Sequence, residues 1–125
     1  MKVADLMQTS LKTISIDATI ADAVAELVES KVSALPVVDR HGRAVGVIST
    51  REVLTAESAH RPDDTRVLEI MTPWPMTIDP DLDARQAARE MLYLNVQRLF
   101  VEYEGALVGV ISQTDIVGAV ATAKV

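Results

Sequence analysis

One segment of this chain occurs twice. Residues 46–52 read Gly-Val-Ile-Ser-Thr-Arg-Glu, and residues 109–115 read Gly-Val-Ile-Ser-Gln-Thr-Asp. Each copy predicts an apolar strand that runs through a serine into a short helix with an acidic residue three positions later. A repeat at this period predicts two copies of one supersecondary unit before any single residue is considered.

Other positions in the two halves match at nearly the same spacing. Met7 matches Met71 and Asp17 matches Asp81 at one common offset, whereas Gly46 matches Gly109 at an offset that is shorter by one. One residue is therefore lost in the turn before the repeated segment. The halves are residues 1–58 and 67–125, and the polar residues 59–66, which include a proline, are expected to form the linker.

Each half is expected to have the element order β-α-β-β-α. Strands are predicted at residues 13–16, 35–38 and 45–48, and again at 77–79, 99–101 and 107–111. Helices are predicted after capping signals at Thr19 and Asp83, and over Arg51–Ser58 and Thr114–Thr122. Apolar residues fall on one face of the first helix of each half: Ile20, Val24, Leu27 and Val28, then Ala84, Ala88, Met91 and Leu92. The prediction is an α+β fold whose two repeats pack about a pseudo-two-fold axis, because half the chain has too little core to stand alone.

Composition excludes several classes of function. A net charge of −6 and only 3% aromatic residues disfavour nucleic-acid binding. The chain has no Cys, and His41 and His60 lie in separate polar segments, so no metal site is expected. No apolar run reaches the roughly 20 residues that cross a bilayer, and the first residues lack the apolar core of a signal peptide. The expectation is a cytoplasmic protein without membrane insertion.

Longer strings extend the repeat over most of the chain. The first half contains Asp5-Leu6-Met7, then Val-Ser-Ala-Leu-Pro-Val-Val-Asp at 32–39 and the segment at 46–52, and the second half repeats them at 69–73, 96–101 and 109–115. In this order they resemble the tandem cystathionine-β-synthase (CBS) domain pair, or Bateman module. The resemblance implies a regulatory module that binds AMP, ADP, ATP or S-adenosylmethionine in the cleft between its repeats. It also implies a disc-shaped homodimer and an unnamed regulated protein.

The resemblance assigns one site around Asp115. It implies that Asp115 binds the ribose, that Ser112 and Thr114 contact phosphate or ribose, and that Arg98 binds phosphate. Ser33 and Ala34 of the other repeat would line the adenine. The chemistry is reasonable, because a carboxylate can accept both ribose hydroxyls and a helix N-terminus attracts phosphate. The alternative is that Ser112 and Asp115 only cap a helix and that Arg98 is a solvated charge.

The equivalent position in the first half departs from the family pattern. The weaker second site would consist of Glu52, Ser49 and Arg51. Glu52 is one methylene longer than the usual Asp, and Ala34 stands where Arg98 stands in the other half. This site is therefore expected to be weak or empty. Trp74, between two prolines, is interpreted as a ring folded over its own loop.

No catalytic residues are expected, because no His pair, Cys or tight carboxylate cluster supplies a base or nucleophile. The prediction is a non-catalytic sensor that requires no cofactor. Two alternatives stay open at this point. One is a structural homodimerisation module with a vestigial cleft, which the Glu52 substitution would fit. The other is a regulatory fragment of a larger enzyme or transporter, although Met1 and the short tail after Val117 favour a stand-alone protein.

Overall fold

The chain folds into two compact units. Unit 1 consists of Met1–Leu11 together with Met76–Val125, and unit 2 consists of Lys12–Pro75. The structure, a computed structural model, describes residues 1–73 and 76–122, and Trp74 lies outside the described residues. Each unit has one sheet and helices, so the predicted α+β fold is confirmed.

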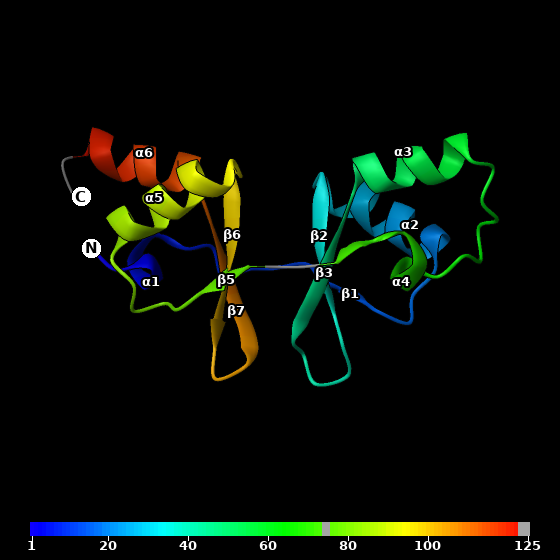
Figure 1. Ribbon diagram of the computed structural model, residues 1–125, viewed down its shortest axis with the longest axis horizontal. Helices are drawn as coiled ribbons and strands as arrows, with labels where there is room; N and C mark the ends of the chain where they lie inside the picture. The colour runs from blue at the N-terminus through cyan, green and yellow to red at the C-terminus, as the bar shows by residue number, and fades with distance from the viewer. Residues whose placement is uncertain (74–75, 123–125) are drawn as a thin grey trace. The chain divides into compact units, whose positions relative to one another are not determined.

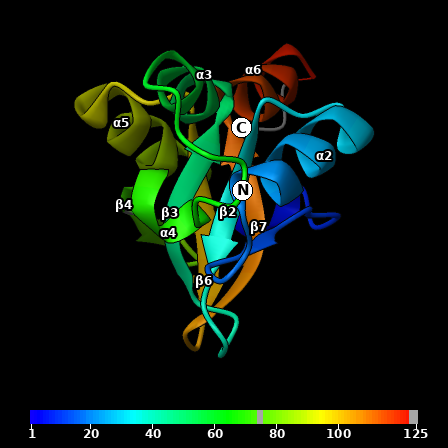
Figure 2. The ribbon, with the colours of Figure 1, turned by 90° about the vertical axis from the view of Figure 1, so that its right-hand side faces the viewer.

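Unit 2 contains a four-stranded sheet in the order β1-β2-β3-β4. Its elements are β1 (Ile14–Ser15), α2 (Ile20–Ser30), β2 (Ala34–Val38), β3 (Ala44–Ser49), α3 (Thr50–Ser58), α4 (Val67–Ile70) and β4 (Thr72–Pro73). β1 is parallel to β2, and the other neighbours are antiparallel. Figure 2 shows α2, α3 and α4 over one face of this sheet.

Unit 1 contains a three-stranded sheet in the order β5-β6-β7. Its elements are α1 (Val3–Leu6), β5 (Thr77–Ile78), α5 (Ala84–Leu94), β6 (Arg98–Tyr103), β7 (Ala106–Ser112) and α6 (Gln113–Ala121). β5 is parallel to β6, and β6 is antiparallel to β7. The helices α5 and α6 contact each other over one face of the sheet, with α1 below them (Figure 1).

Local sequence signals fix the helix ends as predicted. Thr19 caps α2: its hydroxyl accepts the Asp22 amide at 3.2 Å, and the Asp22 carboxylate accepts the Thr19 amide at 3.0 Å. Asp83 caps α5, accepting the amide of Arg85 at 2.8 Å. Each cap satisfies donors that the first helical turn leaves free, which typically stabilises a helix by about 1 kcal/mol.

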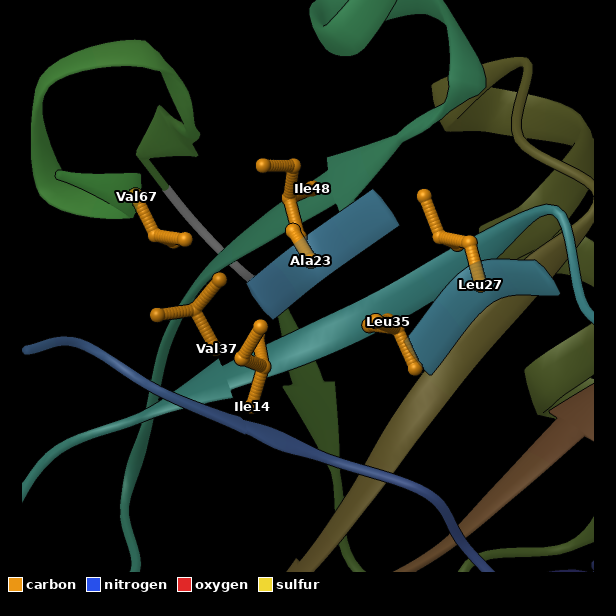
Figure 3. Packing of buried hydrophobic residues seen from close by; sticks show 7 residues of the cluster. All are labelled: Ile14, Ala23, Leu27, Leu35, Val37, Ile48 and Val67. Atoms are coloured by element: carbon orange, nitrogen blue, oxygen red, sulfur yellow. The ribbon is translucent and has the colours of Figure 1, made fainter. Parts of the chain in front are cut away.

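An apolar cluster joins the helices and sheet of unit 2 (Figure 3). Its buried members are Ile14, Ala23, Leu27, Leu35, Val37, Ile48 and Val67. They come from two helices and three strands, so each element is held by side chains of the others. Full burial of one such Val, Leu or Ile side chain contributes about 1.5–3 kcal/mol.

The helix faces differ in part from the predicted apolar stripe. In α2 the buried residues are Ile20, Ala23 and Leu27, whereas Val28 is 71% exposed. In α5 the residue equivalent to Val28 is Leu92, which is 76% exposed. The predicted faces are therefore displaced from the buried stripes, which include Ala23 and Ala87, and apolar side chains are left on the surface.

The short segments α1 and α4 are exchanged relative to the sequence repeats. α1 begins the first repeat but lies in unit 1, where the Val3 amide donates to the Leu82 carbonyl at 2.8 Å. α4 begins the second repeat but lies in unit 2, where the Val67 amide donates to the Ala18 carbonyl at 2.8 Å. Each unit therefore consists of the β-α-β-β-α part of one repeat and the leading helix of the other.

Candidate functional site

The best candidate site lies where β7 ends and α6 begins, in unit 1. Ser112 is the N-cap of α6, and its hydroxyl accepts the Asp115 amide at 3.1 Å. In return, Asp115 Oδ2 accepts the Ser112 amide at 2.9 Å. The predicted capping box is therefore present, and both side chains are half-buried. This box uses Oδ2 of Asp115 and leaves Oδ1 for another donor.

Gln8 supplies that donor. Its Nε2 donates to Asp115 Oδ1 at 3.2 Å, although the two residues are 107 positions apart in the sequence. Gln8 was not among the site residues predicted from the sequence. The repeat relates Gln8 to Thr72 by the offset that relates Met7 to Met71, but the repeat does not show which side chains these two residues contact. Thr72 makes the corresponding contact in unit 2, as described below.

Two further predicted residues lie at the same junction. Arg98, the first residue of β6, is the antiparallel register partner of Ser112 on β7. Thr114 lies in the first turn of α6, and both Arg98 and Thr114 are exposed. The structure therefore brings together Arg98, Ser112, Thr114 and Asp115 within unit 1. A carboxylate, two hydroxyls and a guanidinium beside a helix N-terminus form a set of groups able to bind a ribose and a phosphate.

The equivalent junction in unit 2 uses its acid differently. Glu52 Oε2 accepts the Ser49 amide at 3.0 Å and also the Ser49 hydroxyl. Glu52 Oε1 accepts the Thr72 hydroxyl at 2.7 Å. Burial acts to raise the pKa of the Glu52 carboxyl, but the hydrogen bonds from Ser49 and Thr72 outweigh it and lower the pKa below its ordinary value. Both oxygens of Glu52 therefore have protein donors.

A cavity of about 570 Å³ adjoins this junction within unit 2. Its walls come from α3, α4 and the segments that follow them, and include Arg51, Glu52, Thr55, Arg61 and Thr72. The volume lies in the range of small-molecule pockets. Of the weaker predicted site, Arg51 and Glu52 line this cavity, and Ser49 is the N-cap beside them.

Ser33 and Ala34 also lie in unit 2. Ala34 on β2 is the register partner of Ser49, and the Ser33 carbonyl accepts the Thr50 amide at 3.0 Å. These contacts fix both residues beside the start of α3. Their predicted contact with an adenine bound at Asp115 stays a prediction.

The described residues contain neither a cluster of metal-ligating side chains nor a helix that could span a membrane. No group of three or more His, Cys, Asp and Glu side chains in residues 1–73 and 76–122 could hold a metal ion. None of the helices in the described part of the chain is long and apolar enough to cross a membrane.

Known proteins are similar to this chain over nearly its whole length. The family model of the CBS domain matches residues 3–59 and again 67–122. A CBS domain-containing protein of Dictyostelium discoideum is 32% identical over 126 residues, which cover 91% of this chain and 87% of that protein. The A-adding tRNA nucleotidyltransferase of Aquifex aeolicus is 29% identical, but the match spans only 14% of its length.

Solved structures of CBS proteins have the same fold. CBSX2, solved in complex with AMP, has a TM-score of 0.86 at 29% identity, covering 99% of this chain and 98% of that one. The CBS domain pair of protein MJ0100, solved with 5-methylthioadenosine and S-adenosyl-L-methionine, has a TM-score of 0.83 at 25% identity. Its alignment covers 99% of this chain and 98% of that chain.

Proposed function

Because the chain belongs to the CBS domain family, with two copies of the domain, we propose that it is a regulatory module that binds an adenosine-containing ligand. The observation that carries the proposal is the ligand in the related structures. CBSX2 was solved with AMP, and the MJ0100 pair with 5-methylthioadenosine and S-adenosyl-L-methionine. These ligands differ in charge and in their 5′ groups but share adenosine. AMP, ADP, ATP and S-adenosylmethionine are therefore the candidates.

The chemistry of the Asp115 junction supports this ligand class. Asp115 would accept ribose hydroxyls, and Ser112 and Thr114 would contact the ribose or a phosphate. Arg98, the register partner of Ser112, would add a positive charge for a phosphate. Ser33 and Ala34 remain the proposed contacts of the adenine. At the second junction, Glu52, Ser49 and Arg51 form the weaker site, because Glu52 accepts three hydrogen bonds from the protein whereas Asp115 accepts two.

Thermal unfolding with added AMP, ADP, ATP or S-adenosylmethionine tests the proposal. A ligand at 100 times its dissociation constant stabilises the folded state by about 2.7 kcal/mol, which is a readily measured increase in Tm. Asp115→Ala is expected to abolish that increase. Because Asp115 also belongs to a capping box, the matched control is Asp22→Ala, which removes the acid of the capping box of α2. Asp22→Ala should lower Tm without ligand but keep the ligand-dependent increase.

The outcomes separate binding from folding. If none of the four compounds raises Tm at millimolar concentration, the proposed function is wrong. If the Asp115→Ala and Asp22→Ala variants respond alike to ligand, the ligand binds elsewhere. The module is also proposed to be cytoplasmic and non-catalytic. Because a non-catalytic module does not convert its ligand, mass spectrometry should recover each compound unchanged after incubation.

A second candidate function is homodimerisation, which the surface supports. Val28 and Leu92 are equivalent residues of α2 and α5, and Leu54 and Val117 are equivalent residues of α3 and α6. All four are between 65% and 76% exposed. Their recurrence at equivalent positions of both units is the observation that favours this candidate, because association would remove these apolar side chains from water. Sedimentation equilibrium with and without AMP would distinguish a ligand-sensitive dimer from a purely structural dimer that ignores the nucleotide.

A further inference from the structure

We propose that Gln8 is a specificity-determining residue of the Asp115 site. Its side-chain amide acts with the Asp115 carboxylate to bind the two hydroxyls of a ribose. This inference rests on the proposed function and deepens it. The ligand class that it selects is a nucleoside with an intact vicinal diol, as opposed to a deoxynucleoside.

The backbone of Gln8 is held in place on β7. The backbone N–H of Gln8 donates to the backbone carbonyl of Val110 at 2.8 Å, and the backbone N–H of Val110 donates to the backbone carbonyl of Gln8 at 3.0 Å. The approach is close at Gly109, where a Cβ atom would lie 3.0 Å from the Gln8 carbonyl oxygen. Any adjustment of Gln8 to a ligand must therefore come from its side chain, which is exposed.

The hydrogen bonds of the junction leave a specific set of groups for a ligand. Asp115 Oδ2 accepts a hydrogen bond from the backbone amide of Ser112. Among the described contacts, Oδ1 accepts only the side-chain amide of Gln8. A carboxylate oxygen has two lone pairs, so Oδ1 can accept one ribose hydroxyl beside Gln8. The Gln8 side chain adds a second N–H donor and a carbonyl acceptor next to it. One hydroxyl can thus bind Asp115 while its neighbour binds Gln8.

Unit 2 provides an internal comparison. Thr72 is equivalent to Gln8, because it pairs with Val47 on β3 as Gln8 pairs with Val110 on β7. The Thr72 hydroxyl donates to Glu52 at 2.7 Å, and a threonine has no amide to offer a second hydroxyl. The glutamine therefore gives unit 1 a pair of polar groups that unit 2 lacks.

Calorimetric titration of the full chain with AMP, 2′-deoxy-AMP, 3′-deoxy-AMP and S-adenosylmethionine tests the role of Gln8. The wild type is expected to bind AMP about 5–10-fold more tightly than at least one deoxy analogue, which is the usual effect of one hydrogen bond. Gln8→Ala should weaken AMP binding by about the same factor and reduce that discrimination to near unity. Gln8→Thr, which copies unit 2, should behave like Gln8→Ala. The control is Gln86→Ala on the exposed face of α5, which should bind like the wild type.

The results distinguish two kinds of failure. If the wild type binds none of AMP, ADP, ATP and S-adenosylmethionine, the proposed function fails, and the role of Gln8 fails with it. If the wild type binds one of these compounds and Gln8→Ala binds it equally or more tightly, the role of Gln8 is overturned while the proposed function stands. The ratio of the Kd values for AMP and its deoxy analogues does not depend on the folded fraction, so partial unfolding of a variant would not obscure the result.

Discussion

Asp115 and Glu52 occupy equivalent positions but use their carboxylate oxygens differently. Asp115 receives two donors, one on each oxygen, and the contact from Gln8 is long at 3.2 Å. The additional methylene of Glu52 lets it accept the Ser49 hydroxyl as well as the Ser49 amide, and Thr72 binds its other oxygen at 2.7 Å. Glu52 therefore acts as a connection between α3 and β4, and a ligand at this position would compete with the protein's own donors.

Replacing Glu52 with Gln should change how stability depends on pH. Burial acts to raise the pKa of Glu52, but hydrogen bonds from Ser49 and Thr72 hold the pKa below its ordinary value of 4.5. A carboxyl whose pKa is lower in the folded chain stabilises the fold above the unfolded pKa, and this stabilisation is lost as pH falls through the folded pKa. Glu52→Gln should therefore flatten the fall in the free energy of unfolding below about pH 5, as measured by urea denaturation.

The control for this experiment is Glu57→Gln, which removes one negative charge from the exposed part of the same helix. It should leave the acid limb of the stability profile close to that of the wild type. If the Glu52 and Glu57 variants change the profile equally, the hydrogen bonds of Glu52 do not contribute to the pH dependence.

Most of the Asp115 junction could be predicted from local sequence. Ser112, Thr114 and Asp115 follow one another in the repeated segment, and Arg98 lies at the start of the strand paired with it. Gln8 was missed because its side chain meets Asp115 only through a tertiary contact across 107 positions. The divergence of Glu52 was visible in the sequence, whereas the hydroxyl that binds it, from Thr72, was not.

At the scale of elements, the strands and helices of each β-α-β-β-α pattern were predicted, including the two-residue strands β1 and β5, whereas α1, α4 and β4 were not. Caps such as Thr19 and Asp83 and continuous apolar runs indicate the predicted elements. The helices α1 and α4 have four residues each, and β4 has two. Segments this short carry no periodicity and are not stable alone, so only contact with the rest of a unit defines them.

Two glycine substitutions should have opposite effects on stability. At Gly109 in β7 an added Cβ would lie 2.7 Å from Met7 Sδ and 3.0 Å from the Gln8 carbonyl oxygen. Gly109→Ala should therefore destabilise the chain by about 1–3 kcal/mol by displacing the segment after α1. At Gly118, exposed in α6, an added Cβ would meet nothing within 4 Å, so Gly118→Ala should stabilise by up to about 1 kcal/mol. Urea denaturation of both variants measures the difference. Equal effects of the two changes would contradict close packing at Gly109.

At the scale of the whole molecule, the sequence repeats and the compact units do not coincide. The exchange follows the repeat spacing closely: Lys2 pairs with Asp83 in unit 1, and Arg66 pairs with Thr19 in unit 2. The sequence could not predict this exchange, because α1 and α4 have similar sequence patterns. Only the three-dimensional contacts identify which unit each leading helix belongs to.

The exchange predicts which unit is destabilised when a mutation leaves a cavity beside a leading helix. Val3 of α1 and Val67 of α4 are both 0% exposed, and each lies in the unit opposite to its sequence repeat. Val3→Ala and Val67→Ala should each destabilise by about 2 kcal/mol, because two buried methyl groups are lost and a cavity remains.

Native-state hydrogen exchange should locate the two effects in different halves of the chain. Val3→Ala should increase exchange in α5, β6 and β7, although these elements begin only at Ala84, in the other sequence repeat, and should spare α2 and β2. Val67→Ala should instead increase exchange in α2, β2 and β3, although Val67 itself lies at the start of the second sequence repeat. Each variant is the control for the other, since both remove the same groups from equivalent positions. If exchange instead increases within the sequence repeat that carries each mutation, the leading helices pack on their own repeats and the exchanged arrangement is wrong.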